Sequence, residues 1–212
     1  MSPRILLWAG LIGLAVAMPL LPTIAVARTV GEVSNPPQIP TATIARERGQ
    51  GTGDYFGSAA QKYQQGDYPG ALADYNRAIK INRRSANAYY NRGLLKTTKL
   101  QDDRGALADY DRAIQLKPNY DAAYNNRGNL KAEKLQDYPG ALADYNRAIQ
   151  LRPSNINAYY NRGVLKYTLL NDRAGGIADL QQVSKRAQKQ GKSQDYQAAI
   201  DLLQEWQQTS EK

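Results

Sequence analysis

The stretch GALADYNRAI at residues 70–79 occurs again without change at residues 140–149, and residues 105–114 carry it with one substitution. The copies are 35 residues apart. Self-similarity at a period of about 20 to 50 residues is typical of arrays in which every repeat is one supersecondary unit. The sequence therefore predicts a repeat protein.

The repeated stretch has the apolar pattern of a helix. Ala71, Leu72, Tyr75, Ala78 and Ile79 recur at spacings of three and four, which puts them on one stripe of an amphipathic helix. An aspartate and an arginine three residues apart lie off this stripe, and we expect them to form solvated ion pairs. These pairs are Asp74 with Arg77, Asp109 with Arg112, and Asp144 with Arg147.

A second similar stretch precedes each later copy, at residues 88–100, 123–135 and 158–170. It also has helical periodicity, with a glycine near its middle at Gly93, Gly128 and Gly163. Glycine inside a helix costs about 1 kcal/mol relative to alanine. Its recurrence predicts a close approach of two helices at this point.

Six positions recur together in two consecutive units. They are Tyr89, Gly93, Ala106, Tyr110, Ala113 and Pro118, and then Tyr124, Gly128, Ala141, Tyr145, Ala148 and Pro153. This series resembles the tetratricopeptide repeat (TPR), a helix-turn-helix unit of about 34 residues. The resemblance implies an all-α fold, a right-handed α-solenoid of about four helix-turn-helix repeats. The additional residue follows the glycine, so the first helix is expected to be lengthened or bulged.

The repeats are expected at about 54–84, 85–119, 120–154 and 155–192. Residues 193–212 follow as a capping helix and tail, since Tyr196, Ala199, Ile200, Leu203 and Trp206 share one stripe. A terminal helix with one apolar and one polar face covers the last unit of a stack. The first and last repeats depart most from the pattern, as repeats at the ends of an array do.

Two segments precede the repeats. Residues 1–27 have a basic residue, an apolar run from Ile5 to Leu21 and the small-residue pattern Ala25-Val26-Ala27, which predicts a signal peptide cut after Ala27. The alternative is an uncleaved segment that tethers the chain to a membrane. Residues 28–53 are rich in proline and glycine without apolar periodicity, which predicts a disordered linker. We expect the repeats to lie in the periplasm or another extracytoplasmic compartment.

Composition argues against catalysis. The chain has no Cys and no His, so it lacks disulfides, thiolate chemistry, and the commonest general base and metal ligand. We expect no enzyme activity, no cofactor and no metal. The formal charge of +9 favours anionic partners, with a local concentration of basic residues at 184–192. An alternative function is therefore binding of an anionic surface or polysaccharide.

The resemblance implies that the first helices line a concave groove that holds an extended peptide of a partner protein. The helical period places eleven side chains on this face: Asn87, Tyr90, Asn91, Leu94, Asn125, Asn126, Asn129, Asn157, Tyr160, Asn161 and Val164. Asn91, Asn126 and Asn161 are expected to align as a ladder whose amides bind a peptide main chain. The alternatives are that these amides bond between adjacent helices or were copied by duplication.

Three further expectations concern this face. Tyr90 and Tyr160 are predicted to be exposed beside the amides. Tyr90, Leu94 and Asn157 stand where a clamp for a terminal carboxylate would need Lys or Arg, so that type of binding is not expected. Arg92, Arg127 and Arg162 lie toward the flank and are interpreted as packing stems or solvated pairs.

The expected partner is a protein or peptide, with a client in envelope or membrane-complex assembly suggested by analogy with bacterial relatives of this repeat type. No nucleic-acid partner is expected. Nothing in the sequence defines the oligomeric state, and a monomer is the default.

Overall fold

The computed structural model describes residues 52–210. The predicted signal peptide and nearly all of the predicted linker lie outside this range. Within it the chain is helical throughout, without strands. No helix among these residues has both the length and the apolarity to cross a membrane.

The first helices of the repeats are α3 (Thr52–Gln64), α5 (Ala86–Leu95), α7 (Asp121–Glu133) and α9 (Ile156–Thr168). The second helices are α4 (Tyr68–Ile81), α6 (Asp103–Leu116), α8 (Tyr138–Leu151) and α10 (Arg173–Lys189), and α11 (Ser193–Ser210) ends the described chain.

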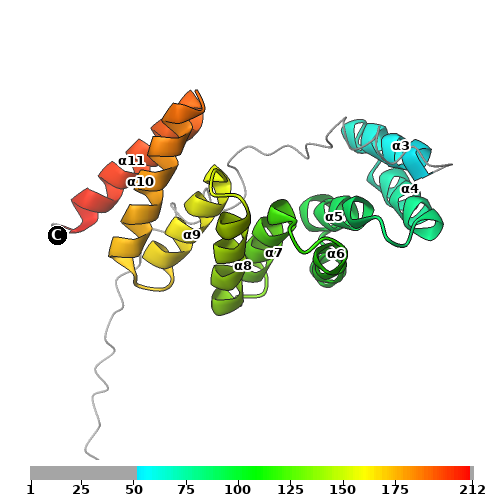
Figure 1. Cartoon of the computed structure of the whole chain (residues 1–212), viewed down its shortest axis with the longest axis horizontal. Helices are drawn as coiled ribbons and strands as arrows, with labels where there is room; N and C mark the ends of the chain where they lie inside the picture. The colour runs from blue at the N-terminus through cyan, green and yellow to red at the C-terminus, as the bar shows by residue number, and fades with distance from the viewer. Residues whose placement is uncertain (1–51, 211–212) are drawn as a thin grey trace, which may run out of the picture.

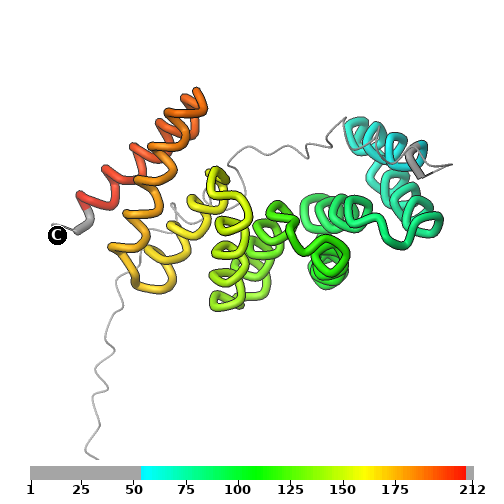
Figure 2. Tube along the Cα trace, in the orientation of Figure 1, coloured from blue at the N-terminus to red at the C-terminus, as the bar shows by residue number. Residues whose placement is uncertain are grey.

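Each first helix packs on its own second helix, and each second helix packs on the next first helix. The pairs follow one another along the long axis of the molecule (Figure 1), and the chain passes through them in sequence order (Figure 2). Contacts are therefore between neighbouring units, as expected of a solenoid. The prediction of an all-α solenoid of helix-turn-helix repeats is confirmed.

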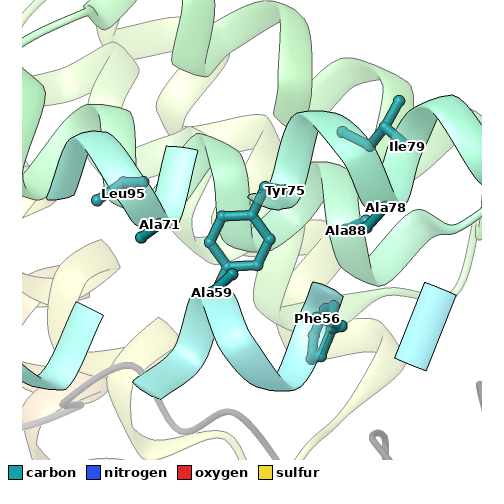
Figure 3. Close-up of a cluster of buried hydrophobic side chains, with 8 residues drawn as sticks. All are labelled: Phe56, Ala59, Ala71, Tyr75, Ala78, Ile79, Ala88 and Leu95. Atoms are coloured by element: carbon teal, nitrogen blue, oxygen red, sulfur yellow. The ribbon is translucent and has the colours of Figure 1, made fainter. Parts of the chain in front are cut away.

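The predicted apolar stripe is the core of each repeat. In the first unit Ala71, Tyr75 and Ala78 are buried against Phe56 and Ala59 of α3 (Figure 3). The equivalent tyrosines of the next two units are also fully buried. Burial of a large side chain contributes about 1.5 to 3 kcal/mol relative to exposure, so these tyrosines anchor the pairing of the two helices.

The glycines inside the first helices allow this pairing. A Cβ added to Gly128 would lie 2.7 Å from Cε1 of Tyr145, and one added to Gly93 would lie 3.0 Å from Cε1 of Tyr110. Both distances are too short for a methyl group against an aromatic ring. The prediction of close helix approach is thus confirmed. In these two repeats the ring of the buried tyrosine approaches the glycine, whereas a Cβ added to Gly163 would lie 3.1 Å from the backbone oxygen of Gly176.

The first glycine of the repeated stretch also has a physical reason. Asp67 caps α4 by accepting a hydrogen bond from the backbone N–H of Gly70 at 2.9 Å, and its carboxylate occupies the space that a Cβ of Gly70 would fill. Three later aspartates cap α6, α8 and α10 in the same way. An N-cap aspartate contributes about 1 kcal/mol to helix stability.

The additional residue is accommodated where the first helix ends. In the second repeat it forms a π-helical turn, Lys96–Leu100, which directly continues α5. In the next two repeats a single wide turn remains, with Leu135 N donating to Leu130 O at 3.3 Å and Leu170 N donating to Leu165 O at 3.1 Å. The expected bulge is confirmed. Insertions of one residue into a helix typically take this π form.

The expected solvated ion pairs are wrong in all three cases. Arg77 does contact Asp74 at 3.0 Å, but Asp74 is itself buried and also accepts from Ser58 and Lys62. Burial alone would raise the pKa of Asp74, yet these hydrogen bonds outweigh it and hold the pKa below its usual value. Arg112 and Arg147 instead bond to nearby glutamines of their own helices.

The aspartates of the later repeats pair across the two helices of their unit. Asp144 accepts from Arg127 through both carboxylate oxygens, at 2.5 and 2.9 Å, and lies 2.9 Å from Nζ of Lys131. Asp109 and Asp179 are held in the same way by Arg92 with Lys96 and by Arg162 with Lys166. The recurring arginines beside the glycines are therefore not solvated pairs. They join the first helix to a buried carboxylate on the second.

The helix α11 covers the last repeat. The rings of Tyr167 and Trp206 stack at 3.7 Å with an interplanar angle of 6°, and Tyr167 OH donates to the carbonyl oxygen of Trp206. Ala199 and Trp206 are buried, with Tyr196 and Leu203 packed around them. The apolar stripe of α11 thus faces α9 and α10.

Candidate functional site

The candidate site is the face of α5, α7 and α9 on which the eleven predicted residues lie. Five of them are buried and six are partly exposed. The buried ones are Asn91, Asn125, Tyr160, Asn161 and Val164, and the partly exposed ones are Asn87, Tyr90, Leu94, Asn126, Asn129 and Asn157. The expected row of amides is therefore only in part accessible to a partner.

An amide network links α9 to α7. Asn161 Nδ2 donates to Asn125 Oδ1 at 3.2 Å and to Asn129 Oδ1 at 2.8 Å. Asn129 Oδ1 also accepts from the hydroxyl of Tyr145 on α8, at 3.0 Å. Three helices thus meet at one amide oxygen, which fixes the orientation of the Asn129 side chain.

The network continues to α5. Asn125 Nδ2 donates to Asn126 Oδ1 at 3.3 Å, and Asn126 Nδ2 donates to the hydroxyl oxygen of Tyr90 at 3.0 Å. We name Tyr90, Asn125, Asn126, Asn129, Tyr145 and Asn161 the amide network. It joins the first helices of three successive repeats.

The expected ladder of Asn91, Asn126 and Asn161 does not form as a continuous row. Asn91 donates to the backbone oxygen of Asn87 within its own helix, at 2.9 Å. Asn161 contacts Asn125 and Asn129, which lie one helical turn apart, rather than Asn126. Asn126 and Asn161 instead form hydrogen bonds between adjacent helices, which is the alternative that the sequence left open. Whether the face binds a peptide stays a prediction.

The expectation that Tyr160 is exposed is wrong. Its side chain is 7% exposed and packs with Val164 in a cluster that includes Leu180 and Trp206. The reason is that α11 contributes Trp206 to this cluster and so shields the end of the array from water. Burial raises the pKa of Tyr160 above its ordinary value.

Tyr90 is partly exposed, and its ring and hydroxyl contact several neighbouring side chains. Its ring lies 4.9 Å from that of Tyr120 and 6.1 Å from that of Tyr110, measured between centroids. Burial and the nearby Asp121 raise the pKa of Tyr90 to about 12, against a hydrogen bond from Asn126 that lowers it. The hydroxyl is therefore neutral at physiological pH and can act as both donor and acceptor.

Sequence reasoning missed Tyr145 as a member of the network. The residue lies on the buried stripe of α8, and its position there indicated only a core role. Its ring is buried while its hydroxyl reaches Asn129. A buried tyrosine usually finds a partner for its hydroxyl, and that rule was the available signal.

The chemistry of this face is that of neutral hydrogen bonding. Asn129 and Asn157 offer amides, Leu94 offers an apolar contact, and Tyr90 offers a hydroxyl. Among residues 52–210 there is no group of three or more His, Cys, Asp or Glu side chains placed to hold a metal ion. The face can recognise peptide groups through donors and acceptors.

The basic segment at 184–192 does not present all of its charges to solvent. Arg186 donates to the carbonyl oxygen of Pro153 at 2.7 Å and to the hydroxyl of Tyr159 at 3.0 Å. Its guanidinium also lies 4.2 Å from the centroid of the Tyr159 ring. Lys185, Lys189 and Lys192 are exposed.

Comparison with solved structures shows the same fold in several proteins. The crystal structure of MamA protein matches with a TM-score of 0.58 at 16% identity, over 74% of this chain and 92% of that one. The first TPR of Spaghetti (RPAP3), bound to the HSP90 peptide SRMEEVD, matches with a TM-score of 0.54 at 24% identity, over 57% and 94%. The Arabidopsis OM64 TPR domain matches with a TM-score of 0.52 at 26% identity, over 56% and 96%.

Sequence comparison points to the same family. No curated protein is similar enough to match the chain. The family model described as TPR repeat matches residues 61–97, 98–134 and 134–169, which together span half of the chain. This range runs from the end of α3 to the start of the turn after α9. With the matched repeats and the shared fold, the chain belongs to the TPR repeat family.

Proposed function

We propose that the chain is a non-catalytic scaffold that holds an extended segment of a partner protein along α5, α7 and α9. Members of the TPR family are in general scaffolds that bind proteins or peptides, and one structural neighbour is bound to a peptide. The proposal transfers this mode to the partly exposed amides and tyrosine of the first helices.

The observation that carries the proposal is the hydrogen bonding of the Asn129 side-chain amide. Its Oδ1 accepts from Asn161 and Tyr145, which turns its Nδ2 away from both. No hydrogen bond within the described residues uses that Nδ2, and the side chain is partly exposed. A donor held in one orientation by its own protein loses little entropy on binding, so it suits the carbonyl groups of an extended peptide.

The residues at the positions where a carboxylate clamp would need Lys or Arg set the type of ligand. Tyr90, Leu94 and Asn157 are neutral, and Arg92 and Arg127 are engaged by aspartates. Recognition is therefore proposed for the main chain of an internal segment rather than for a terminal carboxylate.

The test replaces Asn129 with Asp. This change keeps the Oδ1 acceptor for Asn161 and Tyr145 but turns the outward donor into a second acceptor. Peptides selected on the protein from a random library are the probe, and their affinity is measured by fluorescence anisotropy. We expect binding about tenfold weaker or worse, since a lost hydrogen bond and a repelled carbonyl together cost at least about 1.4 kcal/mol.

Asn119→Asp is the matched control, because it makes the same chemical change at an exposed turn. The proposal predicts wild-type affinity for this control. Equal affinity of the selected peptides for wild type and Asn129→Asp would overturn it, as would failure to select any peptide that binds.

We further propose that the repeats act outside the cytoplasm, in the periplasm or a similar compartment, on a client of envelope or membrane-complex assembly. The support is the apolar run from Ile5 to Leu21 followed by the small residues before Arg28. Mass spectrometry of the protein from its native cells should give an N-terminus at Arg28. An intact N-terminus on a membrane-bound protein would instead identify the segment as an anchor, and an intact N-terminus on cytoplasmic protein would contradict export.

A further inference from the structure

The two edges of the solenoid differ in charge. The helices alternate in direction, so turns from a second helix to the next first helix share one edge, and turns within repeats share the other. We name the first the inter-repeat edge, formed by residues 80–85, 117–120, 152–155 and 185–193. Hydrogen bonds place the last three of these turns next to one another: Asn155 Nδ2 donates to Asp121 Oδ2 at 3.2 Å, and Gln190 Nε2 donates to Ser154 O at 3.1 Å.

The inter-repeat edge is strongly cationic. Eight exposed basic residues lie on it, from all four repeats: Lys80, Arg83, Arg84, Lys117, Arg152, Lys185, Lys189 and Lys192. The acidic groups that face them are Asp54 at the start of α3, Asp121 and Asp195. Asp121 is 3.2 Å from Arg152, and Asp195 is 3.7 Å from Lys192. Most of the positive charge on this edge therefore has no acidic neighbour.

The opposite edge has a different balance of acidic and basic residues. Its turns carry six acidic residues, Asp67, Asp102, Asp103, Glu133, Asp137 and Asp172, and four exposed basic ones, Lys99, Arg104, Lys134 and Arg173. Positive charge is thus in excess on the inter-repeat edge, whereas the opposite edge carries both signs. Cations in the last turn of a helix complement its dipole, which accounts for Lys80 and Lys189. The dipole does not account for Arg83 and Arg84, which lie beyond the end of α4.

Apolar side chains lie among these cations. Ile81, at the end of α4, is 49% exposed. Pro118 and Pro153 are exposed in the next two turns. The edge thus combines basic residues with apolar tips, as surfaces that rest in the headgroup region of a bilayer do. A groove for single-stranded nucleic acid would instead carry stacking aromatics, but Tyr120 on this edge is partly buried beneath Lys117.

We propose that the inter-repeat edge docks on an anionic lipid bilayer, with its lysines and arginines against the phosphate headgroups. The residues of this edge are distinct from the amide network, so the solenoid can rest on a membrane while α5, α7 and α9 remain open to a partner. Binding through this edge does not depend on the peptide-binding proposal.

The test compares two variants of the full chain that each lose four charges. The edge variant changes Lys80, Arg84, Lys185 and Lys189 to Gln, and the control changes Lys99, Arg104, Lys134 and Arg173 to Gln. Partition is measured on vesicles of phosphatidylcholine alone and of phosphatidylcholine with phosphatidylglycerol. Binding to phosphatidylcholine alone measures any contribution of the apolar N-terminal run. The difference in binding between the two kinds of vesicle measures the contribution of charge. Circular dichroism verifies that both variants stay helical.

We expect the gain in binding from phosphatidylglycerol to be at least about tenfold smaller in the edge variant than in the control, and to disappear at high salt. As a second readout, the emission of an Ile81→Trp variant should shift to the blue on the anionic vesicles by more than that of the parent chain, which already contains Trp8 and Trp206. Equal gains in the two variants, or no gain for the wild type, would overturn the proposal. So would tighter binding to soluble dextran sulfate than to the vesicles, which would identify a polymer as the partner.

Discussion

Single charged residues hold the two helices of each repeat together. Asp144 is buried and shares its oxygens between Arg127 and Lys131, whose side chains are 17% and 19% exposed. Loss of the carboxylate charge leaves two partly buried cations without compensation. Breaking a buried ion pair by removing one partner is far more costly than losing an exposed pair.

Asp144→Asn is therefore expected to lower the free energy of unfolding by about 2 to 3 kcal/mol, measured by urea denaturation. Asp111→Asn is the matched control, because Asp111 contacts the same Arg127 at 2.6 Å but is 44% exposed. The control should cost less than about 1 kcal/mol. A similar loss for the two variants would show that burial of the carboxylate does not matter.

At the scale of the helices, the turn between the two helices of each repeat requires one residue in the left-handed conformation. The residue before the capping aspartate has positive φ, at 54° for Gln101, 53° for Gln136 and 54° for Asn171. In the first repeat, which lacks the additional residue, Gly66 takes this position with φ of 81°. A left-handed conformation costs a residue with a side chain about 1 to 2 kcal/mol.

Gln136→Gly should accordingly raise the free energy of unfolding by up to about 1 kcal/mol, the relief being partly offset by the greater entropy of glycine in the unfolded chain. Gln136→Val should lower it, because a β-branched side chain tolerates this conformation poorly. Thermal and chemical denaturation of the pair provide the measurement. If Gln136→Val were more stable than Gln136→Gly, residue 136 would not be in the left-handed conformation.

The sequence predicted the helices well because their apolar stripe repeats with an unambiguous period. Gly128 was correctly interpreted as a point of close approach, since a glycine weakens a helix unless a neighbouring group needs the space of its missing side chain. The site was predicted less well. The period places Asn126 and Asn161 in one row, but side-chain length and helix offset decide that Asn161 meets Asn129 instead. Burial of Tyr160 depends on Trp206, 46 residues later, which no local pattern reveals.

At the scale of the whole molecule, stability is a sum over neighbouring units and a cap. The helix α11 buries Trp206 against Tyr167 and shields Tyr160 and Val164. A chain that ends at Gly191 should unfold at a clearly lower temperature, since loss of Trp burial alone costs about 3 kcal/mol or more. It should also bind the dye ANS through the uncovered end of α9. An unchanged melting temperature would show that α11 does not cap the array.

The central claim is that the orientation of the Asn129 amide, fixed by Asn161 and Tyr145, presents a donor to a bound peptide. Side-chain amide resonances in a ¹⁵N correlation spectrum report this donor directly. Addition of a selected peptide should shift the Nδ2 resonances of Asn129 and Asn157 and leave those of Asn76 and Asn119 in place. Shifts confined to Asn76 and Asn119, or no shift at Asn129 at saturating peptide, would contradict the claim.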